Sequence, residues 1–126
     1  MQHRAVVLTV SDKASRGERD DAAGPFLQEA LAQAGIAVAA REVVPDEVEP
    51  IAAALRRFCD QMAVSLVITT GGTGLSPRDV TPEATAAVIT RPVPGLAEAM
   101  RAEGLRHTPH AMLSRAVAGI RGRTLI

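Results

Sequence analysis

An uncharged run over residues 64–69 leads directly into the glycine-rich segment Gly71-Gly-Thr-Gly74. The run is short and rich in β-branched residues, which is typical of a strand buried on both faces. Glycine lacks a Cβ and adopts positive φ readily, so its backbone can approach a ligand closely. The N–H groups of this segment, with the hydroxyls of Thr73 and the two threonines before the glycines, could cradle a phosphate. A tight turn without a ligand is the alternative.

Neither of the common nucleotide-binding motifs is present in this segment. No Lys-Ser or Lys-Thr pair follows the glycines, as it would in a Walker A loop, and their spacing is not Gly-x-Gly-x-x-Gly.

Strand-like and helical patterns alternate along the chain. Strand patterns cover residues 5–10, 36–44 and 64–69, with the start of another at 124–126. Helical patterns cover residues 25–34, a stretch that opens at Pro45-Asp46-Glu47, residues 82–89 and, more weakly, 96–103 and 111–117. This order predicts an α/β layered sheet with right-handed crossovers, in which ligands bind at the carboxyl ends of strands. The loops over residues 11–24 and 70–81 both lie at such ends.

The composition excludes several classes of function. Fourteen basic residues balance 14 acidic ones among 126, and only 2% are aromatic, which disfavours nucleic acid and membrane surfaces as partners. No apolar run approaches the roughly 20 residues that span a bilayer, and the N-terminus lacks the apolar core of a signal peptide. We therefore expect a single cytoplasmic domain over residues 1–126.

Arg78, Asp79 and Thr81 lie just before a predicted helix. The positive end of the helix dipole favours anions there, so phosphate binding is physically natural. Two structural alternatives remain open. Thr81 precedes Pro82 and could be the helix N-cap, and Asp79 could form an Asx turn.

Asp46 follows the second predicted strand and also has two interpretations. With Glu49 three residues later, it resembles a capping box in which Asp replaces Ser or Thr. Alternatively, Asp46 helps to hold Mg²⁺ or a phosphate-bearing substrate. Mg²⁺ is usually bound by one or two carboxylates and substrate phosphates, so Asp46 with Asp79 would suffice.

Other polar residues could reach the same edge of the sheet. Ser11 and Asp12 end the first strand, and Asp20-Asp21 follow in a loop that could simply be solvated. The Ser114-Arg115 pair, with Arg121 and Arg123 beyond it, could direct cations at phosphate. For Arg121 and Arg123, a solvated helix end is the favoured interpretation.

Three further features are expected to have no role in a site. His107 and His110 are separated by Pro109 and have no nearby Cys or carboxylate, so no zinc site is expected. Cys59 lies on an apolar helix face and is interpreted as an inert core thiol. The methionines at positions 62, 100 and 112 are expected to fill gaps in the core.

An ordered set of motifs across the whole chain resembles the MogA/MoaB family, which includes the G domain of plant and animal molybdenum cofactor proteins. The motifs are Thr9-Val-Ser-Asp12, Val44-Pro-Asp-Glu47, Gly71-Gly-Thr-Gly74, Arg78-Asp-Val-Thr-Pro-Glu-Ala84, Pro94-Gly95, Met112-Leu-Ser-Arg115 and Gly119-Ile-Arg-Gly122. Each motif is weak alone, but the ordered set is specific.

The resemblance implies a three-layer α/β/α fold with a mostly parallel sheet, assembled as a homotrimer, that takes part in molybdenum cofactor biosynthesis. It implies that Mg-ATP donates AMP to the terminal phosphate of molybdopterin, with release of pyrophosphate, and that other cofactor-biosynthesis proteins are partners. Asp46 and Asp79 match the family's two critical carboxylates, which makes them the candidates for catalysis and for Mg²⁺. Candidates for binding molybdopterin or nucleotide are Ser11, Asp12, Gly71, Gly72, Thr73, Gly74, Arg78, Thr81, Ser114 and Arg115.

The resemblance also implies one difference from the family. Its members continue after the equivalent of residues 124–126 with an Asn-Leu-Pro-Gly or Asn-Met-Pro-Gly loop and a C-terminal helix, and we expect this chain to lack both. Two functions follow as hypotheses: a molybdopterin adenylyltransferase, or a MoaB-like carrier or assembly protein that binds molybdopterin without transferring AMP. A purely interactive trimeric scaffold is a third.

Overall fold

The computed structural model describes residues 2–126, over which six strands form one sheet in the order β2-β1-β3-β6-β5-β4. The strands are β1 (Arg4–Val10), β2 (Ala37–Val44), β3 (Leu66–Thr70), β4 (Arg91–Pro92), β5 (Gly119–Arg121) and β6 (Thr124–Leu125). The pairings β1 with β2, β1 with β3 and β3 with β6 are parallel, and those of β5 with β4 and with β6 are antiparallel. The mostly parallel α/β sheet expected from the sequence is confirmed.

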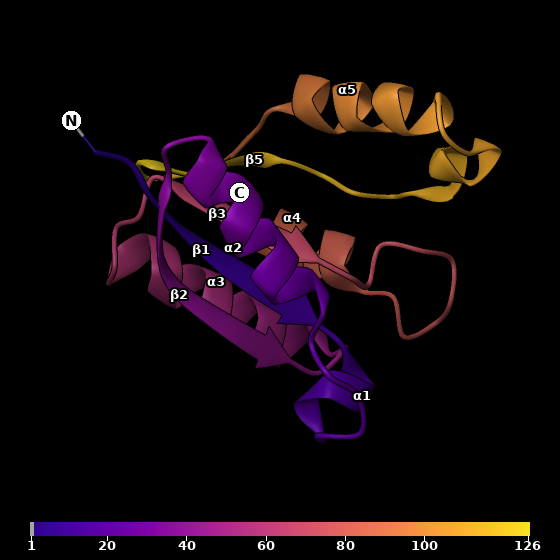
Figure 1. The fold of residues 1–126 in the computed structure, drawn as a ribbon, viewed down its shortest axis with the longest axis horizontal. Coiled ribbons are helices and arrows are strands. Elements are labelled where there is room, and N and C mark those ends of the chain that lie inside the picture. The colour runs from indigo at the N-terminus through magenta and orange to yellow at the C-terminus, as the bar shows by residue number, and fades with distance from the viewer. Residues whose placement is uncertain (1) are drawn as a thin grey trace.

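Helices lie on both faces of this sheet (Figure 1). The helices are α1 (Asp12–Ser15), α2 (Ala23–Gln33), α3 (Val48–Asp60), α4 (Thr81–Val88), α5 (Pro94–Leu105) and the 3₁₀ helix η1 (Pro109–Leu113). In Figure 1, α2 lies in front of β1, α3 lies behind the sheet, and α5 runs beside the segment that follows η1. No helix within residues 2–126 is long and apolar enough to cross a membrane.

The main core lies between β1 and the two helices behind the sheet. Alternate residues of a strand point to the same face. Val6 and Leu8 of β1 therefore pack together against Leu55 and Phe58 of α3 and Val88 of α4. Cys59 is buried at the edge of this core, as expected, and desolvation raises the pKa of its thiol. This packing anchors β1 and β3, whose carboxyl ends lead into the loops described below.

Several local expectations are wrong. A short helix, α1, interrupts the predicted loop over residues 11–24, and α2 begins at Ala23 rather than Pro25. The weak helical pattern over residues 111–117 corresponds to the end of η1 and an extended segment. Met100 and Met112 are 67% and 64% exposed instead of filling the core, because α5 and η1 pack mainly against each other.

The strands near the C-terminus are too short for a period-two pattern to identify. β4 has two residues and β5 has three, and the sequence analysis did not predict either. One usable signal was present: Gly122 has φ +60° between β5 and β6, where a two-residue hairpin turn favours glycine at its first position.

Candidate functional site

The carboxyl ends of β1, β2 and β3 meet at one edge of the sheet. Val10 pairs with Val44 and Thr9 pairs with Thr70, so the three strands end at the same level. The Ser11 N–H continues the ladder by donating to the carbonyl oxygen of Val44, at 2.9 Å. The loops that carry Asp12, Asp46 and the glycine-rich segment therefore begin side by side, as the strand order predicted.

Ser11 has a local structural role at this edge. Its hydroxyl oxygen accepts a hydrogen bond of 3.1 Å from the Ala14 N–H, which makes Ser11 the N-cap of α1. Asp12 is then the first residue of that helix, with its carboxylate free to reach the neighbouring loops.

Asp12 and Asp46 are joined by a reciprocal pair of hydrogen bonds. The Asp12 N–H donates to Oδ2 of Asp46 at 2.8 Å, and the Asp46 N–H donates to Oδ1 of Asp12 at 2.9 Å. The capping interpretation of Asp46 is wrong: the N-cap of α3 is Glu47, and no side chain caps that helix. The side chain of Asp46 is turned toward α1 because an N–H group of that loop is within reach and requires an acceptor.

Arg78 closes this arrangement from the loop between β3 and α4. Its Nε and Nη2 groups donate to the two carboxylate oxygens of Asp12 at 3.0 and 2.9 Å, and Nη2 lies 3.6 Å from a carboxylate oxygen of Glu47. The hydrogen bonds from Arg78, and next the one from the Asp46 backbone, hold the pKa of Asp12 below its ordinary value. The guanidinium that was expected to bind phosphate is thus engaged by a carboxylate.

The glycine-rich segment passes directly over the carboxylate of Asp46. Gly71 and Gly72 have φ of +97° and +70°, and a Cβ on Gly72 would collide with the hydroxyl of Thr81 and lie 3.2 Å from Oδ1 of Asp46. The Thr81 hydroxyl donates to the carbonyl oxygen of Gly71 at 2.9 Å. The expected N-cap role of Thr81 is wrong, since Thr81 is the first residue of α4 and Val80 holds the cap position.

The backbone of this segment also offers unused donors. The N–H groups of Gly72, Thr73 and Gly74 donate no hydrogen bond to any atom of residues 2–126. They are half-buried beside Asp46 and Asp79. The turn and the phosphate cradle, left open as alternatives, are therefore compatible: the turn is formed, and it leaves donors for an anion.

Asp79 closes a turn within the same loop. Its Oδ2 accepts from the Ser76 N–H at 2.9 Å, while its own N–H donates to the carbonyl oxygen of Ser76 at 2.9 Å. The bonds run three residues back along the chain, so the turn is not the Asx turn that was considered. Gly74 faces the carboxylate, because a Cβ there would lie 2.9 Å from Oδ2 of Asp79.

Arg115 makes several hydrogen bonds to the loop that carries Asp79. Its guanidinium donates to the carbonyl oxygens of Gly74 and Asp79 at 2.8 and 2.6 Å and to Glu83 at 2.7 Å. Its N–H donates to the carbonyl oxygen of Thr73 at 2.9 Å. The hydrogen bonds between the Arg115 and Glu83 side chains raise the pKa of Arg115 and lower that of Glu83. Arg115 therefore holds the loop between β3 and α4 in place, and its expected contact with phosphate stays a prediction.

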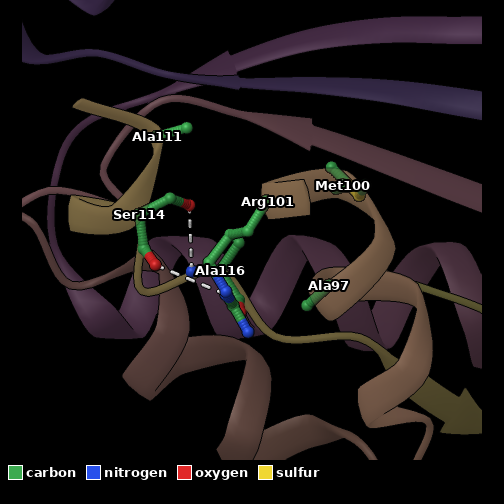
Figure 2. A pocket seen from close by; sticks show the side chains of 6 residues that line it. All are labelled: Ala97, Met100, Arg101, Ala111, Ser114 and Ala116. Atoms are coloured by element: carbon green, nitrogen blue, oxygen red, sulfur yellow. Dashed lines mark hydrogen bonds between the residues drawn. The ribbon is translucent and has the colours of Figure 1, made fainter. Parts of the chain in front are cut away.

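Ser114 makes its hydrogen bonds to Ala111, Arg101 and Ala116, while the next residue, Arg115, contacts the glycine-rich segment at Thr73. It lines a cavity of about 130 Å³ between α5 and the segment after η1, with Ala97, Met100, Arg101, Ala111 and Ala116 (Figure 2). Arg101 crosses that cavity, donating to the carbonyl oxygens of Ser114 and Ala116 at 3.3 and 2.9 Å. The expectation that Ser114 joins Asp46 is not supported by this cavity, whose other lining comes from α5, η1 and the segment after η1.

A larger cavity, of about 290 Å³, opens beside the ends of β1 and β3. Ser11 and Gly71 line it, as do Arg19, Asp20 and Asp21, which the sequence analysis left out of the site or treated as solvated. Asp21 is fixed there because the Thr9 hydroxyl donates to its carboxylate at 3.0 Å. The cavity gives a ligand room next to the glycine-rich segment.

Two groups of residues do not contribute to this edge. Arg121 is not a solvated cation, because it makes hydrogen bonds to Asp60 at 2.9 and 3.0 Å and to the carbonyl oxygen of Val88. His107 pairs with Glu103 on the surface. Within residues 2–126, no group of three or more His, Cys, Asp or Glu side chains could hold a metal ion, so any magnesium site there would use only one or two carboxylates.

Residues 6–126 match the family model MoCF_biosynth, described as a probable molybdopterin binding domain. The chain belongs to this family. The resemblance carried by the ordered motifs is thereby confirmed. Family members with similar sequences include the molybdopterin adenylyltransferase of Helicobacter pylori strain J99, 43% identical over 122 residues that cover 95% of this chain and 69% of that protein. The molybdopterin adenylyltransferase of Escherichia coli K12 is 43% identical over 98% of this chain and 64% of its own length.

Solved structures of the family agree with the fold. The molybdopterin biosynthesis enzyme MoaB from Thermus thermophilus has a TM-score of 0.93 and 55% identity, over 99% of this chain and 79% of that one. A molybdopterin biosynthesis protein from Mycobacterium abscessus has a TM-score of 0.92 and 43% identity, over 98% and 77%. The chain thus spans about two thirds of the curated relatives and somewhat more of the solved ones.

Proposed function

We propose that this protein is a molybdopterin adenylyltransferase of molybdenum cofactor biosynthesis. In this reaction a terminal phosphate oxygen of molybdopterin attacks the α-phosphorus of ATP. The bond from that phosphorus to the bridging oxygen breaks, and pyrophosphate leaves with the electron pair. Relatives that carry this name at 43% identity support the proposal, because they match nearly the whole of this chain.

The observation that carries the proposal is the pairing of two carboxylates with unused backbone donors. Asp46 and Asp79 lie beside Gly72 and Gly74, whose N–H groups donate to no atom of the described residues. Transfer of an adenylyl group requires alignment and neutralisation of charge more than a covalent nucleophile. Backbone N–H donors that a turn already holds in place can align a phosphate without any reorganisation of the protein.

The same carboxylates fit a magnesium ion that accompanies ATP. Oδ2 of Asp46 accepts from Asp12 and Oδ2 of Asp79 accepts from Ser76, so within residues 2–126 each carboxylate keeps Oδ1 without a hydrogen bond. Mg²⁺ prefers such oxygen ligands and keeps several waters and substrate phosphates. Asp46 and Asp79 would hold it, and it would supply positive charge against the phosphates.

The test is the Asp79→Asn variant assayed for pyrophosphate release with molybdopterin, ATP and Mg²⁺. We expect turnover to fall by about 100-fold or more, while molybdopterin still binds, because the amide keeps the shape but loses the charge. Asp60→Asn is the matched control, since Asp60 is ion-paired with Arg121 away from this edge. Unchanged turnover in Asp79→Asn would remove its assigned role.

The wild-type protein distinguishes the other functions in the same assay. Binding of molybdopterin without release of pyrophosphate would identify a MoaB-like carrier. Absence of any molybdopterin binding would identify a scaffold.

We also propose that the protein assembles as a homotrimer, as the family resemblance implies. Exposed apolar side chains on α5, η1 and the segment after η1 support this proposal; they are Leu96, Met100, Leu105, Met112, Leu113 and Val117. Several large apolar side chains exposed on neighbouring elements are typical of a protein interface. Light scattering should give three times the 13.2 kDa chain mass, and a monomer at micromolar concentration would contradict the proposal.

A further inference from the structure

We propose that Arg78 is a positioning residue, which acts through Asp12 to fix the orientation of the Asp46 carboxylate. The inference rests on the proposed function, because it concerns how one carboxylate of that site is held. It replaces the expectations that Arg78 binds a phosphate and that Asp12 contacts molybdopterin or nucleotide directly.

One hydrogen bond orients the carboxylate of Asp46. Its Oδ2 accepts the Asp12 N–H at 2.8 Å, which leaves Oδ1 directed to the Gly72 side of the carboxylate. Rotation of the carboxylate would break that bond and leave the first N–H of α1 without this acceptor. The orientation of Asp46 therefore depends on where Asp12 and its helix lie.

The position of Asp12 depends on a few polar contacts. α1 has only four residues and buries none of them, so packing alone holds it weakly. Besides the bond from its own N–H to Asp46, two contacts of the Asp12 carboxylate hold it at this edge: the Asp46 N–H donates to Oδ1, and Arg78 donates to both carboxylate oxygens. Arginine suits this task because its planar fork matches both carboxylate oxygens at once. Without Arg78, one hydrogen bond would remain on that carboxylate.

The positive charge of Arg78 is balanced by two neighbouring carboxylates. The guanidinium lies between Asp12 and Glu47, so the three side chains together carry one net negative charge. Such a group does not attract a polyphosphate in the way that an unpaired arginine would. Arg78 also belongs to the loop that carries Asp79, so its contact with Asp12 links the loops of both carboxylates across 66 residues of sequence.

The test compares Arg78→Gln and Asp12→Asn in the full chain. We expect each to lower kcat by about tenfold or more, because small misplacements at a reacting centre cost that much, while the KM for ATP stays within about twofold. The double variant should be no slower than the slower single variant, since both changes break the same contact. Arg78→Lys should recover part of kcat.

The matched control is Arg16→Gln. Arg16 is the C-cap of α1, and its replacement by Gln removes the same charge. Its side chain pairs with Glu18 and makes no hydrogen bond to Asp12 or Asp46, and the variant keeps the backbone bond from the Arg16 N–H to the carbonyl oxygen of Asp12. Its kcat should stay within about twofold of wild type. An equal loss of kcat in this control would overturn the proposal, and so would a tenfold rise in the KM for ATP of Arg78→Gln at unchanged kcat, which would make Arg78 a phosphate ligand.

A second measurement separates this inference from the proposed function. Amide hydrogen exchange of the ligand-free protein should be about tenfold faster at Asp12 and Asp46 in Arg78→Gln than in Arg16→Gln, because the paired N–H groups open more often. If the wild type releases no pyrophosphate, the proposed function fails, and this exchange result still decides the role of Arg78. Equal exchange in the two variants would overturn it.

Discussion

The hydroxyl of Thr81 donates a hydrogen bond of 2.9 Å to the carbonyl oxygen of Gly71, and its N–H donates one of 3.1 Å to that of Gly72. Thr81 is only 2% exposed. These two bonds join the first residue of α4 to the turn that follows β3. They fix the position of the glycine-rich segment relative to α4, and therefore the distance from Gly72 to Asp46.

Thr81→Val should therefore lower the free energy of unfolding by about 1–2 kcal/mol. The substitution keeps the shape but removes one partly buried hydrogen bond. Thr90→Val is the control, because the Thr90 hydroxyl makes the same kind of bond to Ile120 at an exposed position, and it should cost about 0.5 kcal/mol or less. Urea unfolding of the two variants measures the difference, and equal costs would contradict the role given to Thr81.

Gly72→Ala should destabilise the protein by about 1–3 kcal/mol. Its backbone has φ +70°, which costs an alanine free energy, and the new Cβ would meet the Thr81 hydroxyl. Gly95→Ala should have the opposite sign and stabilise the protein by up to about 1 kcal/mol. Gly95 lies in α5, and a Cβ there meets no atom within 4 Å. Melting curves check both, and a neutral Gly72→Ala would show that the turn relaxes freely.

The ion pair between Asp60 and Arg121 should make stability depend on pH in the acid range. Hydrogen bonds from Arg121 hold the pKa of Asp60 below its ordinary value of 3.8. The unfolded chain then binds a proton before the folded one does, so the stabilisation is present above that value and is lost as pH falls through the lower, folded pKa. The melting temperature of the wild type should exceed that of Asp60→Asn at neutral pH, and the difference should shrink below about pH 4. A constant difference down to pH 2 would contradict this assignment.

Cys59 should react slowly with thiol reagents in the folded protein. The side chain is 7% exposed, and burial raises its pKa, so both access and the thiolate fraction are reduced. We expect a disulfide reagent at pH 8 to modify the native protein at least about 100-fold more slowly than the unfolded chain. Similar rates would indicate that the C-terminal end of α3 opens easily.

Local sequence patterns were sufficient for the elements that are long and buried. β1 and β3 have short uncharged, mostly apolar runs and α3 has a helical apolar stripe, and each of these elements was predicted within a few residues, as was the less buried β2. Because parallel strands end at a common edge, their order also placed Ser11, Asp46 and the glycine-rich segment together. The family resemblance followed from motifs at those same positions.

The partners of the polar side chains could not be read from local patterns. Asp46 and Thr81 both precede helical stretches in the manner of N-caps, yet their side chains bond to Asp12 and Gly71. A capping rule considers only neighbours along the chain, whereas a side chain bonds to whichever donor or acceptor the folded chain brings closest. The same reason explains why the carboxylate and carbonyl partners of Arg78 and Arg115 were not predicted, although both arginines were candidates for binding phosphate.

The amino-acid sequence by itself determined the layered α/β fold, the edge at which the loops meet and the family, because these depend on hydrophobic periodicity and on ordered motifs. Only the tertiary structure decided which groups at that edge are engaged and which are left over. Asp12 and Arg78 lie 66 residues apart, and their contact exists because β1 and β3 are neighbours in the sheet. Within residues 2–126, such contacts leave Oδ1 of Asp46 and the N–H groups of Gly72, Thr73 and Gly74 without a partner, and these are the groups that we propose a substrate uses.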